Sequence, residues 1–209
     1  MTNYKLYYFN LDARAELIRL LFAYGGIKYE DIRYSFDEWP KVKESGPFPF
    51  KQMPVLEVDG KPICQSNAIC RHLARVIGID GKNETEKVLI DMVADSCTYE
   101  IVEKAYDHRA PFAEPDENKR VEKGKVFRDA KLEPFLINLD NLYQKIGGKY
   151  FVSDEITYAD LAYYRMINNV KPLLADLPTP HPKLKDLYAR ISENEKLKEW
   201  EKHKAEAIF

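Results

Sequence analysis

Apolar positions in the first eighty residues alternate between the spacing of a strand and that of a helix. Residues 4–9 are aromatic and aliphatic, which predicts a strand. From Arg14 onward, apolar residues recur at helical spacing until Gly25-Gly26, so an amphipathic helix with a glycine C-cap is expected. Residues 27–34 predict a second strand. A strand, a helix and a strand within about thirty residues form a βαβ unit, with parallel strands and a right-handed crossover.

A β-hairpin is predicted where Val55 begins a second apolar run, since Asp59-Gly60 is a two-residue turn between apolar strands. Met53-Pro54 precedes it. X-Pro bonds alone have a low-energy cis form, which would leave the main chain of Met53 open to pair with an extended peptide. A strand edge of this kind is suited to a small peptide.

Helical spacing resumes directly after the hairpin, so Ser66 is expected at or near an N-cap. The N-terminus of a helix presents unpaired amides to a carboxylate. The hairpin therefore places a peptide-pairing edge beside a carboxylate site. Residues 37–43 predict a short irregular helix between the βαβ unit and the hairpin.

Only helices are predicted after residue 83. The spacing predicts long helices at about 85–109 and 119–145, a capping box from Thr157 to Asp160, and shorter helices near 182–192 and 195–204. We therefore expect an α/β domain of order βαβαββα over residues 1–79, a linker at 80–83, and an all-α domain over 84–209.

Composition narrows the class of protein. The chain has 209 residues, of which 45% are hydrophobic and 32% charged, as in a soluble globular protein. The 32 basic and 34 acidic residues give a net charge of −2, which predicts no nucleic-acid or anionic-membrane partner. The sequence shows no basic leader followed by an apolar stretch and no apolar run of membrane-spanning length, so we expect a cytoplasmic location.

Cysteine and histidine usage predicts neither a disulfide framework nor a metal site. Three cysteines, Cys64, Cys70 and Cys97, include no Cys-x-x-Cys pair and are expected to be free, buried thiols. The four histidines lack ligand spacing. These are His72, His108, His181 and His203.

Six motifs, in order along essentially the whole chain, carry a resemblance. They are Asn3-Tyr-Lys-Leu-Tyr-Tyr8-Phe-Asn, Arg14-Ala-Glu-Leu-Ile-Arg, Trp39-Pro-x-x-Lys43, Met53-Pro-Val-Leu-Glu-Val-Asp-Gly60, Gln65-Ser-x-Ala-Ile and Ile156-Thr-Tyr-Ala-Asp-Leu161. Together they resemble a cytosolic glutathione transferase of the sigma class. The resemblance implies the glutathione transferase fold, with a thioredoxin-like N-terminal domain and an all-α domain contributing an electrophile pocket and the interface of a homodimer. It also implies a role in detoxification, with glutathione as co-substrate and no cofactor or metal.

The resemblance makes Tyr8 the catalytic hydroxyl, supported by Arg14. A thiol with a pKa of about 8.5 is mostly protonated at neutral pH, whereas the thiolate is the nucleophile. A phenol stays protonated and can donate a hydrogen bond to the sulfur anion, which is worth roughly 1.5 to 3 kcal/mol. Judged without the motif, Tyr8 would be one of many tyrosines that serve only core packing.

The resemblance also implies how glutathione is held. Gln65 and Ser66 would bind its γ-glutamyl end, and the main chain of Met53, next to Pro54, its cysteinyl unit. Trp39, Lys43 and Gln52 would reach its glycyl end. From the residues alone, Ser66 is equally a plain N-cap, Lys43 a solvated lysine and Trp39 a core residue.

The second substrate is expected in a pocket of variable elements. Its residues would be Leu11, Asp12, Ala13, Tyr106, Arg109 and Phe209. The chain departs from the family pattern at Asp12-Ala13, where Arg-Gly is common, and at Lys51, which takes the place of a glycine. It also has Tyr99 where an acid would reach the neighbouring subunit's glutathione; Asp95 or Glu100 could replace that acid.

Three functions remain open. The first is conjugation of glutathione to a soft, hydrophobic electrophile. The second is isomerisation of prostaglandin endoperoxides, an activity of some sigma-class members. The third is a non-catalytic ligand carrier like the lens S-crystallins. Retention of Tyr8, Arg14, Gln65 and Ser66 favours an enzyme.

Overall fold

The structure, a computed structural model, describes residues 2–103, 115–171, 174 and 181–204. It divides into two compact units. The first is the chain up to Ile79 together with a C-terminal segment that begins at Asn194, and the second is Asp80–Glu193. The division differs from the sequence-based grouping of residues 84–209 at its C-terminal end, because the last helix packs against the first helix of the chain.

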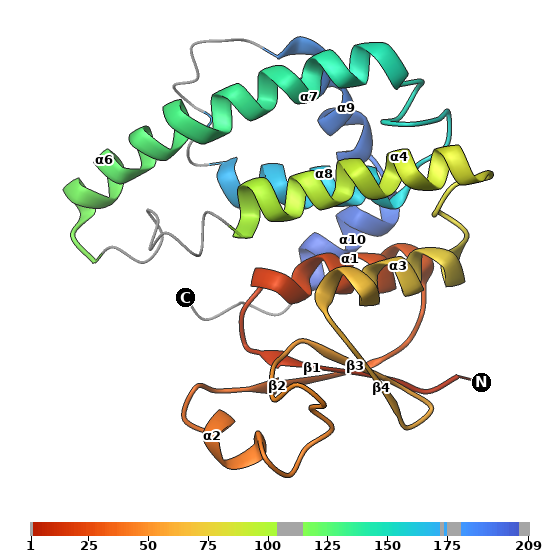
Figure 1. The fold of residues 1–209 in the computed structure, drawn as a ribbon, viewed down its shortest axis with the longest axis vertical. Coiled ribbons are helices and arrows are strands. Elements are labelled where there is room, and N and C mark those ends of the chain that lie inside the picture. The colour runs from red at the N-terminus through yellow and green to blue at the C-terminus, as the bar shows by residue number, and fades with distance from the viewer. Residues whose placement is uncertain (1, 104–114, 172–173, 175–180, 205–209) are drawn as a thin grey trace. The chain divides into compact units, whose positions relative to one another are not determined.

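A four-stranded mixed sheet forms the base of the first unit (Figure 1). Its strands are β1 (Tyr4–Phe9), β2 (Glu30–Tyr34), β3 (Val55–Val58) and β4 (Lys61–Cys64), in the order β2-β1-β3-β4. β1 and β2 are parallel, whereas β3 is antiparallel to both of its neighbours. The predicted βαβ unit and hairpin are thereby confirmed.

The second strand begins later than the sequence indicates. The helix before it ends at Gly25 and is capped by Gly26, whose left-handed φ of 63° is easily adopted by a residue without a Cβ. The next amide, that of Ile27, still donates to Phe22 O at 3.0 Å as part of this cap. The chain therefore leaves the helix before it can pair with β1, and β2 starts at Glu30.

Helices cover the sheet of the first unit. They are α1 (Glu16–Gly25), preceded by a 3₁₀ turn (Ala13–Ala15), α2 (Trp39–Val42), α3 (Ser66–Ile77) and α10 (Glu195–His203). Figure 1 shows α1 and α3 side by side over one face of the sheet. Alternate strand residues serve the two faces, as the period of two requires. Tyr4 packs on Phe22 of α1, whereas Tyr7 packs on Phe48.

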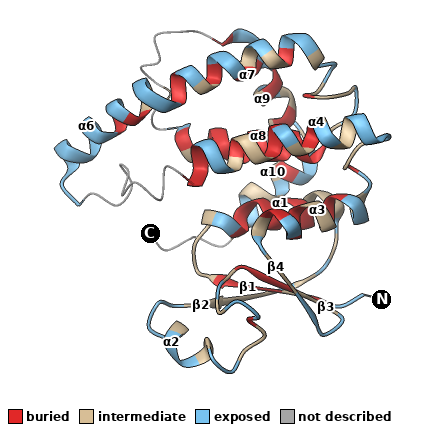
Figure 2. Ribbon diagram, in the orientation of Figure 1, coloured by how far each residue is buried: buried red, intermediate tan, exposed pale blue. Residues whose placement is uncertain are grey.

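The described part of the second unit consists of helices joined by loops, and no strand is found in it. Its helices are α4 (Glu84–Asp95), α6 (Glu117–Phe127), α7 (Glu133–Ile146), α8 (Tyr158–Val170) and α9 (Pro182–Ser192). The long predicted helices contain π-helical segments at Ser96–Glu103 and Arg128–Leu132, which period counting did not reveal. α8 is buried along most of its length and α6 is mostly exposed (Figure 2).

The predicted capping box at the start of α8 is confirmed. The Asp160 carboxylate accepts hydrogen bonds from the Thr157 amide at 2.7 Å and the Thr157 hydroxyl at 2.8 Å. Its other oxygen accepts from the Phe151 amide at 2.8 Å. Asp160 is fully buried, and its hydrogen bond from the Phe151 amide links the preceding loop to the N-terminus of α8.

Candidate functional site

The strand register brings the predicted site residues to one end of the sheet. Val55 of β3 lies opposite Tyr7 of β1 on one side and Cys64 of β4 on the other. Tyr8, Pro54 and Gln65 are the chain neighbours of these three paired residues. Because adjacent strands lie about 4.8 Å apart, continuing the register by one step would set Tyr8 and Gln65 on either side of Pro54, roughly 10 Å from each other.

Tyr8 is 5% exposed, and its hydroxyl oxygen accepts a hydrogen bond from the Arg14 amide at 3.4 Å. The amide is presented by the 3₁₀ turn, whose first residue, Ala13, has a φ of 25°. An N–H donated to the phenol oxygen draws electron density from it and makes the O–H a better donor. The main chain of Arg14 thus supports Tyr8, while the residue as a whole is exposed.

The Met53-Pro54 bond is cis. Pro54 is buried, Met53 is half-buried and Gln52 is exposed. Among the described residues, no hydrogen bond uses the Met53 amide or carbonyl. These two groups stand at the start of β3, beside Tyr8, where an extended peptide can reach them.

Gln65, rather than Ser66, occupies the N-cap of α3, and Ser66 is the first helical residue. Gln65 is exposed and has a φ of 72° and a ψ of 113°, a conformation that a residue with a Cβ adopts only at a cost. The first amides of α3 follow directly. The Gln65 side-chain amide and the N-terminal amides of α3 are thus adjacent in the chain, and both could bind a γ-glutamyl carboxylate.

Trp39, Lys43 and Gln52 lie in the segment between β2 and β3. The Trp39 ring packs edge-on against Phe48 at 4.9 Å between centroids, and against Phe9 at 5.9 Å. It is half-buried, so part of it belongs to the core, as the residue-only interpretation expected. Lys43, half-buried at the C-terminus of α2, forms no ion pair with the residues that the structure describes.

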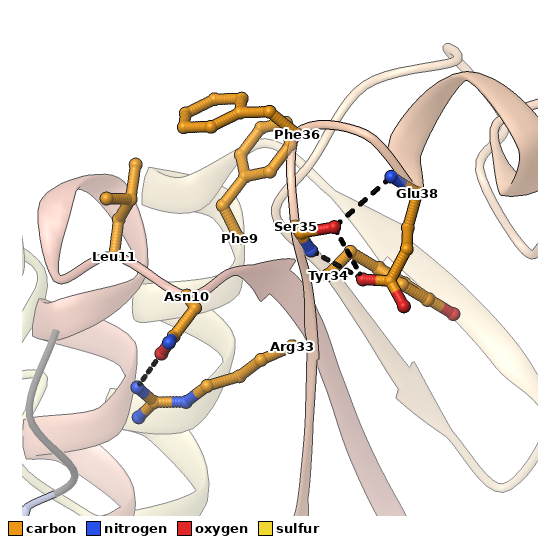
Figure 3. A pocket seen from close by; sticks show the side chains of 8 residues that line it. All are labelled: Phe9, Asn10, Leu11, Arg33, Tyr34, Ser35, Phe36 and Glu38. Atoms are coloured by element: carbon orange, nitrogen blue, oxygen red, sulfur yellow. Dashed lines mark hydrogen bonds between the residues drawn. The ribbon is translucent and has the colours of Figure 1, made fainter. Parts of the chain in front are cut away.

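A pocket of about 490 Å³ opens beside this end of the sheet (Figure 3). It is lined by Phe9, Asn10, Leu11, Arg33, Tyr34, Ser35, Phe36 and Glu38. The rings of Phe9 and Phe36 stack at 4.7 Å, although Phe36 is 65% exposed. On the other side, Phe9 contacts the ring of Tyr8 at 5.7 Å. The pocket thus lies one aromatic ring away from the candidate catalytic hydroxyl.

Of the predicted electrophile residues, Leu11 lines this pocket, whereas Asp12 and Ala13 do not. Tyr106, Arg109 and Phe209 lie outside the described residues. Sequence reasoning missed Phe9 and Phe36 as lining residues. An aromatic residue that ends a strand and another in the next loop carry no local sign that they meet, because their contact depends on the parallel pairing of β1 and β2.

A buried charge network lies beneath the pocket. Arg19 is fully buried, and its Nε donates to Asp31 at 3.1 Å while its Nη1 donates to Leu11 O at 2.7 Å. Arg33 donates to the same Asp31 carboxylate at 2.8 Å and to Asn10 Oδ1 at 2.9 Å. Arg19 is buried and Arg33 is half-buried, and both are paired, as burial of a cation requires. They fix the turn that follows β1.

The described residues hold no cluster of three or more metal-ligating side chains. His108 is outside the described residues. The three cysteines are free, with Cys70 and Cys97 buried and Cys64 half-buried. Burial raises the pKa of Cys64, despite a hydrogen bond from the Phe50 main chain, and also that of Cys97, so neither thiol is activated.

Tyr99, in the second unit, is 51% exposed on the π-helical segment after α4. Asp95, which precedes that segment, is half-buried, and Glu100 is exposed. Within the described parts of the chain, no helix is both long and apolar enough to span a membrane.

Comparison with known proteins gives the same picture from an independent direction. Residues 2–75 match the glutathione S-transferase N-terminal domain, and residues 95–204 match the glutathione S-transferase C-terminal domain. Hematopoietic prostaglandin D synthase of Gallus gallus is 40% identical over 195 residues, which covers 91% of each chain. A glutathione S-transferase of Anopheles gambiae is 33% identical over 203 residues, which covers 95% of each.

Solved structures agree with these matches. A Caenorhabditis elegans glutathione S-transferase superimposes with a TM-score of 0.83 at 31% identity, over the full length of both chains. Both domain matches, the full-length relatives and the thioredoxin-like sheet with its helical second part lead to one conclusion. The chain belongs to the glutathione S-transferase family.

Proposed function

We propose that this transferase conjugates glutathione to soft, hydrophobic electrophiles, with the Tyr8 hydroxyl stabilising the thiolate. The observation that carries the proposal is the strand register at one end of the sheet, which pairs Tyr7, Val55 and Cys64, the chain neighbours of Tyr8, Pro54 and Gln65. The Arg14 amide at 3.4 Å from the Tyr8 oxygen strengthens that hydroxyl as a donor. Positioning of the thiolate beside its target and stabilisation of its charge supply the rate.

The spacing of Tyr8, Pro54 and Gln65 in this register suits an extended tripeptide. Each extended residue spans about 3.4 Å and the γ-linkage lengthens the chain further, so the cysteinyl and γ-glutamyl units together cover most of the roughly 10 Å between Tyr8 and Gln65. In this proposal the cysteinyl unit pairs with the Met53 main chain, and the γ-glutamyl carboxylate lies at Gln65 and Ser66. The glycyl end then extends toward Trp39, Lys43 and Gln52.

The electrophile is proposed to enter the pocket walled by Phe9, Leu11 and Phe36. These side chains are apolar, and the exposed ring of Phe36 offers a face for a planar or aliphatic group. Because Phe9 contacts Tyr8, an electrophile in this pocket would lie near the thiolate that Tyr8 stabilises in this proposal. Such proximity favours attack on an activated aromatic halide or an unsaturated carbonyl.

Tyr8→Phe tests the mechanism, with Tyr7→Phe as the matched control. Tyr7 is the adjacent tyrosine, equally buried, but its hydroxyl faces Glu57 at 3.4 Å on the other side of the sheet. We expect Tyr8→Phe to slow conjugation of an activated aromatic halide at least tenfold, about 1.4 kcal/mol, with little change in glutathione affinity. Tyr7→Phe should keep the wild-type rate. Equal rates in Tyr8→Phe and wild type would remove Tyr8 from its role.

Isomerisation of a prostaglandin endoperoxide is the second candidate, because the Gallus gallus synthase is 40% identical over nearly the whole chain. In this proposal the thiolate stabilised by Tyr8 would serve both reactions. Turnover of the endoperoxide measured beside conjugation by the same preparation separates them. A carrier without catalysis is disfavoured by the assembled Tyr8, Pro54 and Gln65.

Sigma-class membership, a detoxifying role and a cytoplasmic location complete the proposal. We also propose a homodimer. Its support is apolar surface within each unit: Phe50 is 65% exposed in the first, and Val88 and Met92 are 65% and 41% exposed on α4 of the second. Val88 and Met92 are four residues apart and therefore share a helix face.

A further inference from the structure

Three cations hold three consecutive residues of the turn that follows β1. Arg33 of β2 donates to Asn10 Oδ1, and Arg19 of α1 donates to Leu11 O. The third cation is Lys204, just after α10, whose Nζ donates to Asp12 Oδ2 at 3.5 Å. The two arginines are local to the βαβ unit, whereas Lys204 comes from the far end of the sequence.

Asp12 connects this turn to Tyr8. Its carbonyl accepts from the amides of Ala15 at 3.1 Å and Glu16 at 2.9 Å, so Asp12 begins the 3₁₀ turn. That turn presents the Arg14 amide to the Tyr8 hydroxyl. A shift of Asp12 therefore shifts the donor that acts on Tyr8. Hydrogen-bond strength falls steeply with distance and angle, so small shifts matter.

Lys204 sits in a pocket of acids rather than in open solvent. Its Nζ lies 3.2 Å from Glu201, 3.5 Å from Asp12 and 3.8 Å from Glu16. The Glu16 side chain is only 4% exposed and also accepts from Trp200 Nε1 at 3.0 Å. Burial lowers the pKa of Lys204, but the carboxylates of Glu16, Asp12 and Glu201 outweigh it, so the pKa is raised and the ammonium is kept. Ion pairs this shielded are screened less than surface pairs.

We propose that Lys204 is a positioning residue for catalysis, which holds Asp12 so that the 3₁₀ turn aims the Arg14 amide at the Tyr8 hydroxyl. The C-terminal segment would thus tune the thiolate-stabilising group without touching either substrate. The inference about rate rests on the proposed function, whereas the inference about the turn does not.

The experiment compares Lys204→Met with Lys202→Met. Lys202 is an exposed lysine in the last turn of α10, two residues before Lys204, so both variants lose one positive charge at the same end of α10. In Lys204→Met we expect the pKa of bound glutathione, followed by thiolate absorbance, to rise by about 0.5 unit, equivalent to about threefold less thiolate below that pKa. The rate constant kcat should fall in step while KM for glutathione holds. Lys204→Arg should restore both.

Hydrogen exchange of the amides at residues 10–14 tests the turn independently of chemistry. Faster exchange at these residues in Lys204→Met, but not in Lys202→Met, supports the proposal that Lys204 holds the turn. If wild-type protein does not lower the pKa of the glutathione thiol, only the proposed function is overturned, and the exchange result still tests the turn. The positioning role is overturned if exchange at residues 10–14 is the same in Lys204→Met as in wild type. It is also overturned if wild type lowers the pKa of bound glutathione and Lys204→Met lowers it equally. Thermal melts of both variants separate a local from a global effect.

A double-mutant cycle combines Lys204→Met with Asp12→Asn. The effects of the two substitutions on the thiol pKa should be non-additive, and additive effects would contradict a contact between Lys204 and Asp12.

Discussion

Tyr7 and Tyr8 are neighbours in β1 whose hydroxyl groups have different surroundings. Burial and the nearby Glu57 carboxylate raise the pKa of Tyr7 to about 12, which makes it a structural phenol. Tyr8 instead receives an amide hydrogen bond from Arg14. Alternation along a strand already sends the two side chains to opposite faces. Alternation alone does not say which tyrosine is catalytic; the family resemblance selected Tyr8, and Tyr8 is the one that contacts the turn with Arg14.

Gln65 illustrates a second residue-scale feature, a strained backbone at a candidate binding position. Its φ of 72° would suit glycine better than glutamine, and its side chain makes no capping hydrogen bond to α3. Strain of this kind costs of order 1 kcal/mol and persists where the residue has another role. We infer that the side-chain amide is retained for glutathione.

Substitution of Gln65 separates the strain from the contact. Gln65→Ala and Gln65→Gly both remove the amide, and each should weaken glutathione binding about tenfold, or 1.4 kcal/mol, by calorimetry. Only glycine relieves the strain. The free energy of unfolding measured in urea should therefore be at least about 1 kcal/mol higher for Gln65→Gly than for Gln65→Ala. Equal stability of the two variants would show that the backbone at this position is unstrained in solution.

At the scale of elements, the start of α8 is the most strongly fixed helix terminus described here. Its Asp160 accepts three hydrogen bonds while fully buried. The exposed caps of α4 and α6, Asn83 and Asp116, each accept one bond from the helix backbone. Sequence spacing revealed the capping box, but the link from Asp160 to Phe151 follows from the fold of the loop.

Asp160 should make stability depend on pH. Burial raises its pKa to about 6, against the hydrogen bonds from Phe151 and Thr157, which lower it. An unfolded aspartate titrates near 3.9, so the stabilisation of the protonated form is complete below about pH 4 and is lost as the pH rises through 6. The free energy of unfolding of wild type, minus that of Asp160→Asn, should therefore decrease over this window.

Urea unfolding of both proteins at several pH values measures that difference, because the other groups titrate alike in the two. A difference that grows with pH would mean that the three donors keep the carboxylate ionised in the folded protein.

At the scale of the whole molecule, each unit keeps apolar side chains on its surface. Val88 and Met92 form an exposed pair on α4, while Val126 on α6 is 64% exposed. Single exposed apolar residues are ordinary, but a pair on one helix face is suited to a partner. The chain was predicted to form a homodimer, and this pair is the natural place to test that proposal.

Met92→Glu should weaken self-association at least tenfold, about 1.4 kcal/mol, because it places a charge in an apolar interface. Val126→Glu is the control, since it makes the same kind of change on another exposed helix. Sedimentation velocity over a range of concentrations measures both. A monomeric wild type, or equal association of the two variants, would contradict an interface on α4.

Features that depend on local spacing could be predicted from the amino-acid sequence. It placed β1, the hairpin with its Asp59-Gly60 turn, and the α8 capping box, because periodicity and turn chemistry act within a few residues. It also singled out Tyr8 and Gln65 through a matched family pattern. The start of β2 and the π-helical segments escaped it, since neighbouring elements override propensity there.

Only the tertiary structure decided which distant residues meet. The register of β1, β3 and β4 puts Tyr7, Val55 and Cys64 in one row and so brings their chain neighbours Tyr8, Pro54 and Gln65 to the same end of the sheet. Parallel pairing with β2 stacks Phe9 on Phe36. The return of α10 to α1 brings Lys204 to Asp12 across nearly the whole length of the chain. Such contacts are set by topology and by the burial of apolar faces, which no local pattern encodes.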